Sequence, residues 1–274
     1  MQNKSKNNAI ALSIGFFLII MIALVTIFHP FSAKNDSDAK NASQHDSAAE
    51  KLNASPKISS GELAKKIQRK EKLMLIDIRS KTEYDQEHLL DSQNIPLADI
   101  DEALKIMDRH AAYVLIGADS ISEPIAETLG VLSDSGFEKI SYLAGGFSDW
   151  KSNYYPTISE GDPNRFTDQS KVSYIQTDAL KEMIGSGTGF TIIDVRKNSQ
   201  FNEEHLEGAI NIFLDDLEKR KNDIPLGKKI ILYDNDGLWA FKAAVKLFDM
   251  GFFNTFALSD GLDSWKKKGY ATVK

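Results

Sequence analysis

The sequence contains two copies of one pattern, and this internal duplication constrains the fold more than any other feature. Residues 73–79 read Leu-Met-Leu-Ile-Asp-Ile-Arg and lead to Glu87-His88-Leu89, and residues 191–196 read Thr-Ile-Ile-Asp-Val-Arg and lead to Glu204-His205-Leu206. The paired positions keep a constant offset along the chain. A shared register of this length indicates two domains of one fold, and 274 residues are enough for each to bury its own core.

Short apolar segments alternate with helical segments in both copies. The expected strands are Leu73–Ile78, Tyr113–Ile116 and Ile230–Tyr233, and the expected helices are Ser60–Lys70, Glu123–Ser133 and Ala240–Asp249. Gly136 and Gly251 stand where a glycine commonly ends a helix. This alternation predicts an α/β fold, in which each domain is a small parallel sheet with helices on both faces.

A long uncharged run precedes the repeats. Residues 9–28 (AIALSIGFFLIIMIALVTIF) are about twenty in number, enough for a helix to cross a ~30 Å hydrocarbon core. A cleaved secretory signal is the alternative, but this run is long for one and no small-x-small cleavage site follows it. Lys4 and Lys6 precede the run and only Lys34 follows at some distance, which favours a cytoplasmic amino terminus. We therefore expect a single-pass anchor in the cell membrane, with the domains extracytoplasmic.

The remaining boundaries follow from composition. Residues 1–8 form the expected cytoplasmic end, and residues 29–57, rich in Ser, Asn, Asp, Ala and Lys, form a flexible linker that cannot bury enough apolar surface to fold. The first domain is expected at 58–156, an interdomain linker at 157–170 and the second domain at 171–274. The net charge is −6 with both signs interspersed, so no basic stripe predicts a nucleic-acid partner.

The motifs of each copy, in their order, resemble those of the rhodanese family. Each copy has an Asp-x-Arg at the end of its first strand, an aromatic residue before a histidine, an Asn-Ile and a closing Gly-x-x-x-Trp. The residues are Asp77, Arg79, Tyr84, His88, Asn94 and Trp150 in the first copy, and Asp194, Arg196, Phe201, His205, Asn211 and Trp265 in the second. The resemblance covers nearly everything from residue 58 onward, and it implies a tandem of rhodanese-like domains.

The resemblance implies sulfur transfer through a cysteine persulfide, yet the chain contains no cysteine. In the family this cysteine opens a loop whose main-chain N–H groups, with a helix terminus behind them, stabilise the anionic sulfur. The matching loops begin at Ile116 and at Asp234. Ile116 offers no nucleophilic atom and is interpreted as apolar filler, so no sulfurtransferase activity is expected. Asp234 is interpreted as a carboxylate that accepts the loop amides itself and caps the following helix.

The second loop is the candidate binding site. Its residues are Asp234, Asn235, Asp236, Gly237 and Trp239. The Asp-x-Asp-Gly spacing also resembles a phosphoryl-transfer signature and the start of a calcium loop. An Asp-dependent, metal-assisted hydrolase or a weak cation site at Asp234 and Asp236 is therefore an alternative, although neither motif is completed downstream. Trp239 is either an exposed anchor for a partner or a lid over the loop.

The other shared residues are interpreted as structural. This set comprises Asp77, Arg79, His88, Trp150, Asp194, Arg196, His205 and Trp265. The sequence thus predicts a membrane-anchored, extracytoplasmic tandem of inactive rhodanese-like domains that binds or scaffolds, with no cofactor and no metal. Its expected partners are the membrane, through residues 9–28, and as a candidate another envelope protein.

Overall fold

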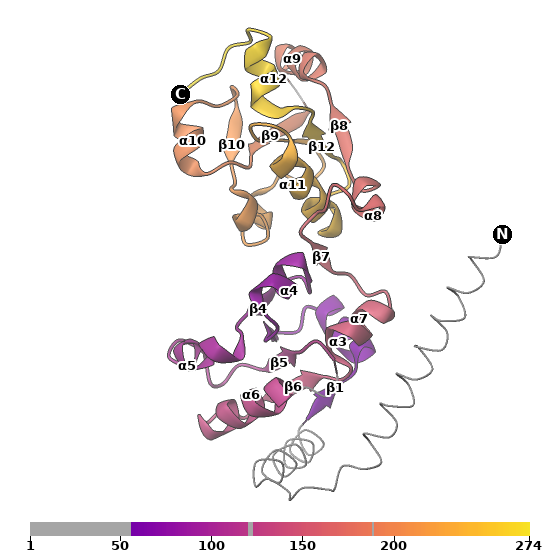
Figure 1. The fold of residues 1–274 in the computed structure, drawn as a ribbon, viewed down its shortest axis with the longest axis vertical. Coiled ribbons are helices and arrows are strands. Elements are labelled where there is room, and N and C mark those ends of the chain that lie inside the picture. Colours follow the sequence, from indigo (N-terminus) through magenta and orange to yellow (C-terminus); the bar gives the residue numbers. More distant parts are fainter. Residues whose placement is uncertain (1–55, 120–122, 188) are drawn as a thin grey trace, which may run out of the picture. The chain divides into compact units, whose positions relative to one another are not determined.

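The first domain is a five-stranded parallel sheet with helices on both faces (Figure 1). A computed structural model describes residues 56–119, 123–187 and 189–274 of the chain. The strand order is β1-β6-β5-β2-β4, and every neighbouring pair is parallel. The elements are β1 (Lys57–Ile58), α3 (Ser60–Gln68), β2 (Met74–Asp77), α4 (Lys81–Gln86), β3 (Glu87–His88), β4 (Ser92–Asn94), η1 (Leu97–Asp99), α5 (Ile100–Ala103), β5 (Tyr113–Ile116), α6 (Glu123–Asp134), β6 (Ile140–Leu143) and α7 (Gly146–Ser152).

The second domain repeats this architecture strand for strand. Its sheet has the order β8-β12-β11-β9-β10, again parallel throughout. The elements are β8 (Ser173–Ile175), α9 (Thr177–Ser186), β9 (Phe190–Asp194), α10 (Asn198–Glu203), β10 (Ala209–Asn211), η2 (Leu214–Asp216), η3 (Lys221–Asp223), β11 (Lys229–Tyr233), α11 (Leu238–Asp249), β12 (Thr255–Leu258) and α12 (Gly261–Lys267). The predicted α/β fold with two similar parallel sheets is therefore confirmed.

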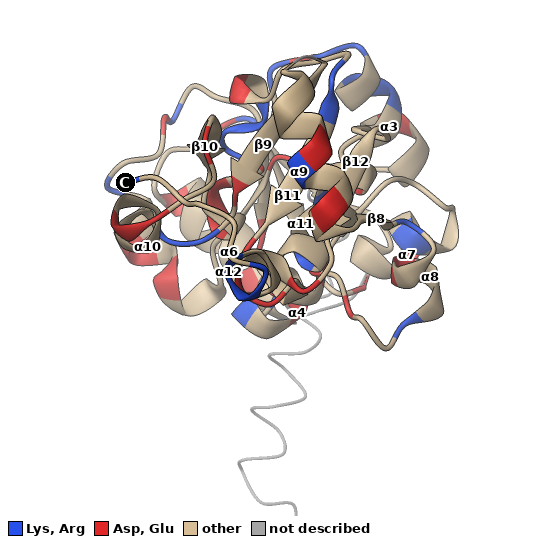
Figure 2. Ribbon diagram, turned by 90° about the horizontal axis from the view of Figure 1, so that it is seen from above, with Lys and Arg blue, Asp and Glu red and all other residues tan. Residues whose placement is uncertain are grey.

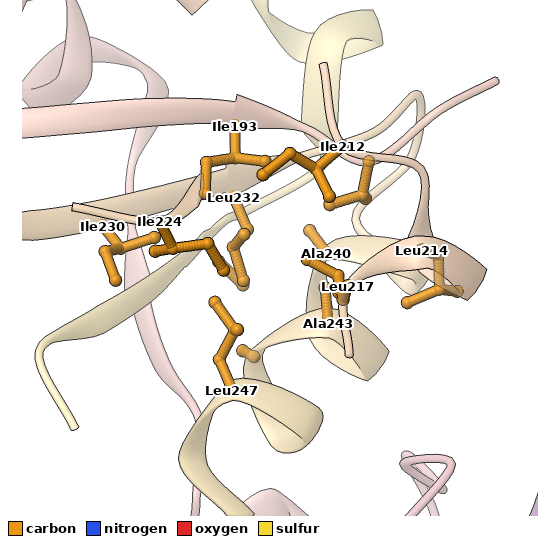
Figure 3. Close-up of a cluster of buried hydrophobic side chains, with 13 residues drawn as sticks. Ile193, Ile212, Leu214, Leu217, Ile224, Ile230, Leu232, Ala240, Ala243 and Leu247 are labelled. Atoms are coloured by element: carbon orange, nitrogen blue, oxygen red, sulfur yellow. The ribbon is translucent and has the colours of Figure 1, made fainter. Parts of the chain in front are cut away.

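Each sheet is buried on both faces, which explains why its central strands are apolar without alternation. In the first domain, α6 covers one face and α3 with α7 covers the other. In the second, α11 packs on one face, where its Ala243 and Leu247 meet Leu232 of the sheet (Figure 3), and α9 with α12 packs on the other. The side chains of β11 from Ile231 to Tyr233 are completely buried.

The segment between the two domains has regular structure of its own. It contains β7 (Ile158–Ser159) and α8 (Phe166–Gln169), and β7 pairs antiparallel with β3. The main-chain N–H of Ser159 donates to a carboxylate oxygen of Asp249 in α11 at 3.0 Å. Both sheets and this segment belong to one compact unit. The segment thus contacts an element of each domain.

Charged residues of both signs are spread over the elements of the described chain (Figure 2). Most lysines near an acid form exposed ion pairs, such as Lys81 with Asp85 in α4 and Lys105 with Glu102. Pairs of this kind contribute little to stability, typically below about 1 kcal/mol. The Asp–Arg pairs described next differ from these because both partners are buried.

Candidate functional site

An aspartate–arginine pair ends the first long strand of each domain in the same geometry. The Asp77 carboxylate accepts hydrogen bonds from the main chain and the guanidinium of Arg79, with Nη2 to Oδ2 at 2.6 Å. Asp194 and Arg196 repeat this, also at 2.6 Å. Both carboxylates are fully buried. Such bidentate pairs hold the strand end in place, and we call each one a strand-end clamp.

The two histidines of the motif are held alike by their own domains. Nδ1 of His88 donates to the carbonyl of Tyr84 at 2.7 Å, and Nδ1 of His205 donates to that of Phe201 at 2.9 Å. Each imidazole also stacks on the ring of that same residue, with centroids 3.9 Å apart. These contacts hold the chain where it leaves α4 in the first domain and α10 in the second.

The tryptophans near the end of each domain are buried and hydrogen-bonded. The indole N–H of Trp150 donates to the carbonyl of Pro156, and that of Trp265 donates to the carbonyl of Ala271, both at 2.9 Å. Their exposed fractions are 3% and 2%. They pack on the sheet and tie down the chain that follows α7 and α12.

The strand register shows which residues of the two central strands correspond. Asp77 lies opposite Ile116 in the first sheet, and Asp194 lies opposite Tyr233 in the second. Ile116 therefore corresponds to Tyr233, the last residue of β11, and both are buried in the sheet.

The loop after β5 consequently begins at Gly117. The carbonyl of Gly117 accepts the N–H of Phe147, and the carbonyl of Asp234 accepts the N–H of Leu262, at 2.8 Å in each case. Gly117 is thus the counterpart of Asp234, and the sequence-based pairing of Ile116 with Asp234 is one residue out of register. The physical reason is that Ile116 completes a strand hydrogen-bonded to β2, so it cannot also open the loop.

Asp234 is buried beneath the loop that it opens, and it accepts two of that loop's main-chain amides. Its Oδ1 accepts the N–H of Gly237 at 2.8 Å, and its Oδ2 accepts the N–H of Trp239 at 2.9 Å. Asp236 accepts the N–H of Leu238 at 3.0 Å. Two carboxylates therefore satisfy the first amides of α11, which otherwise lack acceptors and carry the positive end of the helix dipole.

Burial raises the pKa of Asp234 to about 6. The hydrogen bonds from Trp239 and Gly237 act in the opposite direction, and the negative charge of Asp236 raises the pKa further. Desolvation thus outweighs the amide bonds. An ionised Asp234 is held in place by the loop but is costly to bury.

The rest of the loop surface is divided between polar and apolar groups. Nη1 of Arg196 donates to Oδ1 of Asn235 at 3.1 Å, which joins the strand-end clamp to the loop. Trp239 is partly buried and packs at 5.7 Å between centroids against Phe213. Leu238 is 42% exposed. The candidate residues of the loop therefore lie together, with Asp234 buried and Asp236 exposed.

The family model of the rhodanese-like domain matches the chain twice, over residues 59–153 and 176–268. The chain belongs to the rhodanese-like domain family. Thiosulfate sulfurtransferase GlpE from Coxiella burnetii is 27% identical over 75 residues, which is 27% of this chain and 70% of GlpE. Uncharacterized protein YqhL from Bacillus subtilis is 35% identical over 77 residues, which is 28% of this chain and 61% of YqhL.

Among solved structures, the thiosulfate sulfurtransferase from Pseudomonas aeruginosa is similar over 80% of this chain and 43% of its own, at 16% identity and a TM-score of 0.43. This chain spans less than two thirds of YqhL. The family match establishes two rhodanese-like domains, and neither of them contains a cysteine that could carry sulfur.

The described residues can be searched for a membrane span and for a metal site. Within residues 56–119, 123–187 and 189–274, no helix is long and apolar enough to span a bilayer, and the predicted anchor at 9–28 lies outside them. In the same part of the chain, no group of three or more His, Asp or Glu side chains is placed to hold a metal ion.

Glu218 has a structural role that the sequence did not indicate. Glu218 contacts Nε2 of His88 at 3.0 Å and Nζ of Lys246 at 3.2 Å. No motif marks Glu218, because it lies outside the repeated pattern and its histidine partner is far away in the chain.

Proposed function

We propose that this protein is a membrane-anchored, extracytoplasmic tandem of non-catalytic rhodanese-like domains that acts as a binding or scaffold module. The observation that carries the proposal is the loop before α11. There the acceptor for the loop amides is the carboxylate of Asp234, a side chain of the protein itself. A site whose amides are already engaged has no vacancy for a persulfide, and the chain has no thiol to form one.

The counterpart in the first domain supports the same proposal. Gly117 has no side chain, so the loop after β5 carries no nucleophile at the position of Asp234. The GlpE relative is by name a thiosulfate sulfurtransferase. We propose that this chain keeps that kind of domain as a scaffold without its transfer chemistry.

The test is a sulfur-transfer assay from thiosulfate to cyanide on the purified full-length chain, with an authentic thiosulfate sulfurtransferase run in parallel. We expect thiocyanate formation at the uncatalysed rate. Turnover above that rate by the cysteine-free chain would end the proposal. The hydrolase alternative requires magnesium-dependent phosphate release from an aryl phosphate that is lost in Asp234→Asn, and we expect none, because both oxygens of Asp234 are engaged.

The membrane part of the proposal is supported by the uncharged run at residues 9–28. We expect the full-length chain to sediment with membranes, to resist carbonate extraction and to be released by detergent. A variant lacking residues 9–28 should appear in the soluble fraction. Protease added to intact cells after removal of the wall or outer layers should digest the two domains if they are extracytoplasmic.

A further inference from the structure

A buried histidine of the first domain contacts a glutamate of the second domain. Nε2 of His88 lies 3.0 and 3.1 Å from the two carboxylate oxygens of Glu218. The side chain of His88 is 3% exposed and that of Glu218 is 19% exposed. Lys246 of α11 approaches the same carboxylate at 3.2 Å. Residues that are distant in sequence thus meet inside a single compact unit.

The surroundings of His88 determine how many protons the ring carries. Nδ1 lies 2.7 Å from the carbonyl oxygen of Tyr84, which can only accept, so Nδ1 must hold a proton. Nε2 faces the carboxylate of Glu218, which also only accepts when it is ionised. A neutral imidazole has one N–H, whereas this geometry uses two. The arrangement therefore fits an imidazolium opposite a carboxylate.

Glu218 is kept in its ionised form by the same neighbours. Burial raises the pKa of Glu218, but the hydrogen bond and charge of His88, followed by Lys246, outweigh it and lower the pKa overall. The carboxylate is thus charged across the neutral range.

The contact borders a cleft of about 690 Å³ that elements of both domains line. The other charged and titratable side chains around it are Lys81, Tyr84, Asp85, Asp91, Glu160, Asp215, Lys219, Lys242 and Lys246. Lysine, tyrosine and carboxylate side chains ordinarily titrate well outside pH 5.5–8.5, whereas imidazole ordinarily titrates near 6.5. Asp91 also pairs across the domains, with Lys221, but Asp91 is 64% exposed and its pair is correspondingly weak.

We propose that His88 and Glu218 form a pH-dependent clasp between the two domains, which is closed while the imidazole is doubly protonated and opens when it loses the Nε2 proton. The ion pair exists while both ring nitrogens carry a proton, and it is lost once rising pH removes the proton from Nε2. It is lost again in strong acid, where Glu218 is protonated. After deprotonation a nitrogen lone pair faces the partly buried carboxylate of Glu218, which is repulsive. This inference does not depend on what the module binds.

The equivalent histidine of the second domain provides a matched control. His205 has the same stack on an aromatic ring and the same Nδ1 contact. Within the described part of the chain, its Nε2 makes no hydrogen bond. Loss of its charge should therefore leave the clasp unchanged.

The absence of native cysteine allows a direct test with a pair of spin labels. Ile106→Cys and Leu226→Cys place one label on each domain at side chains that are 84% and 82% exposed. The distance distribution would be measured by pulsed electron resonance on the full-length chain in detergent between pH 5.5 and 8.5. We expect one narrow distance at low pH and a broader distribution at high pH. The closed-to-open ratio should fall by up to about tenfold per pH unit above the midpoint.

His88→Gln should give the broad distribution at every pH, and His205→Gln should behave as the parent. A distribution that does not change with pH in the parent, or a pH response that survives in His88→Gln, would overturn the proposal. Should His88→Gln fail to fold, Glu218→Gln removes the carboxylate at nearly constant size and must also abolish the response. Nitrogen NMR of the parent gives an independent check, because His88 must show two protonated ring nitrogens wherever the narrow distance is seen, and His205 serves as its reference.

Discussion

The two domains have the same scaffold and different loops. The strand orders are identical, and the strand-end clamps agree to the same 2.6 Å contact. The loop after the central strand opens with Gly117 in one domain and with Asp234 in the other. The sheet therefore does not need a particular residue at the loop. The buried strand-end clamps set the position of the strand end. The first loop position can therefore be a glycine or a carboxylate that caps the following helix.

The largest effect is expected at the clamp, the feature that the domains share most closely. Asp77→Ala and Asp194→Ala each leave a buried arginine without its carboxylate, which typically costs about 3–5 kcal/mol. Urea unfolding followed by tryptophan fluorescence would measure both, since Trp150 reports the first domain and Trp239 with Trp265 the second. The control is Asp85→Ala, which removes only an exposed pair. A cost that is large in one domain and small in the other would show that the clamps are not equivalent.

The second-largest loss of stability is expected where the first residues of α12 and α7 contact the loops. A Cβ on Gly261 would lie 2.5 Å from the carbonyl oxygen of Asn235, and one on Gly146 would lie 2.7 Å from that of Gly117. Both glycines also have positive φ. We expect Gly261→Ala and Gly146→Ala to lower the unfolding free energy by about 2–4 kcal/mol.

Gly251→Ala distinguishes the two causes of the lower unfolding free energy, which are the positive φ and the close contact with the loop. It also has positive φ, but nothing lies within 4 Å of its Cβ position. Gly251→Ala should therefore cost only the conformational penalty of about 1–2 kcal/mol. Equal losses at Gly251 and Gly261 in the same urea experiment would mean that the close approach to the loop contributes nothing.

The fold could be predicted from the sequence because its signals are repeated and local. The strand predicted at Tyr113–Ile116 is reproduced to the residue, and the helix predicted at Ala240–Asp249 ends at the same residue but begins two positions earlier, at Leu238. That early start depends on capping by Asp236 and Asp234. Apolar periodicity marks the body of a helix, whereas its first turn is set by such side-chain contacts.

The candidate site was harder to predict, for two physical reasons. The offset that relates Asp77 to Asp194 also relates Gly117 to Asp234, so the repeat held the correct register, but the apolar end of β5 concealed where the loop begins. The contact of His88 with Glu218 depends on how distant segments meet, and no spacing in the sequence encodes that.

The loops can be compared through pH, because only one of them carries an ionisable group at its first position. The pKa of Asp234 is raised from 3.8 to about 6, so between these values the folded state binds more protons than the unfolded state. Its contribution to stability is complete below about pH 4 and is lost as pH rises through 6, by roughly 1–3 kcal/mol. In Asp234→Asn this loss should be absent. Unfolding free energies of parent and variant at pH 4, 5, 6 and 7 would show it as a changing difference.

The first domain is the internal control for that titration. Gly117 cannot ionise, so the transition reported by Trp150 should have the same pH profile in the parent and in Asp234→Asn. A difference between parent and variant that stays constant from pH 4 to 7 would show that the carboxylate does not titrate in this range.

The smallest effect is expected at a pair of surface contacts that the domains also share. Lys151 pairs with Glu87 in the first domain, and Lys266 pairs with Glu204 in the second at 2.6 Å. The pKa of Glu87 is lowered because Lys151 and Thr157 outweigh its burial, and the pKa of Glu204 is lowered chiefly by Lys266. Lowered carboxyl pKa values stabilise the folded state above about pH 4.5, and this contribution is lost as pH falls through the folded value.

Lys151→Ala and Lys266→Ala should each cost less than about 1 kcal/mol at pH 7. Lys151→Ala should cost the more of the two, because Glu87 is 17% exposed and Glu204 is 33% exposed, so that solvent screens the second pair better. Both costs should vanish at pH 3, where the carboxylates are protonated, and both should shrink in 1 M salt. A cost that persists at pH 3 would mean that the lysine stems stabilise their domains by packing, and the two domains would then differ in how they cover the same strand end.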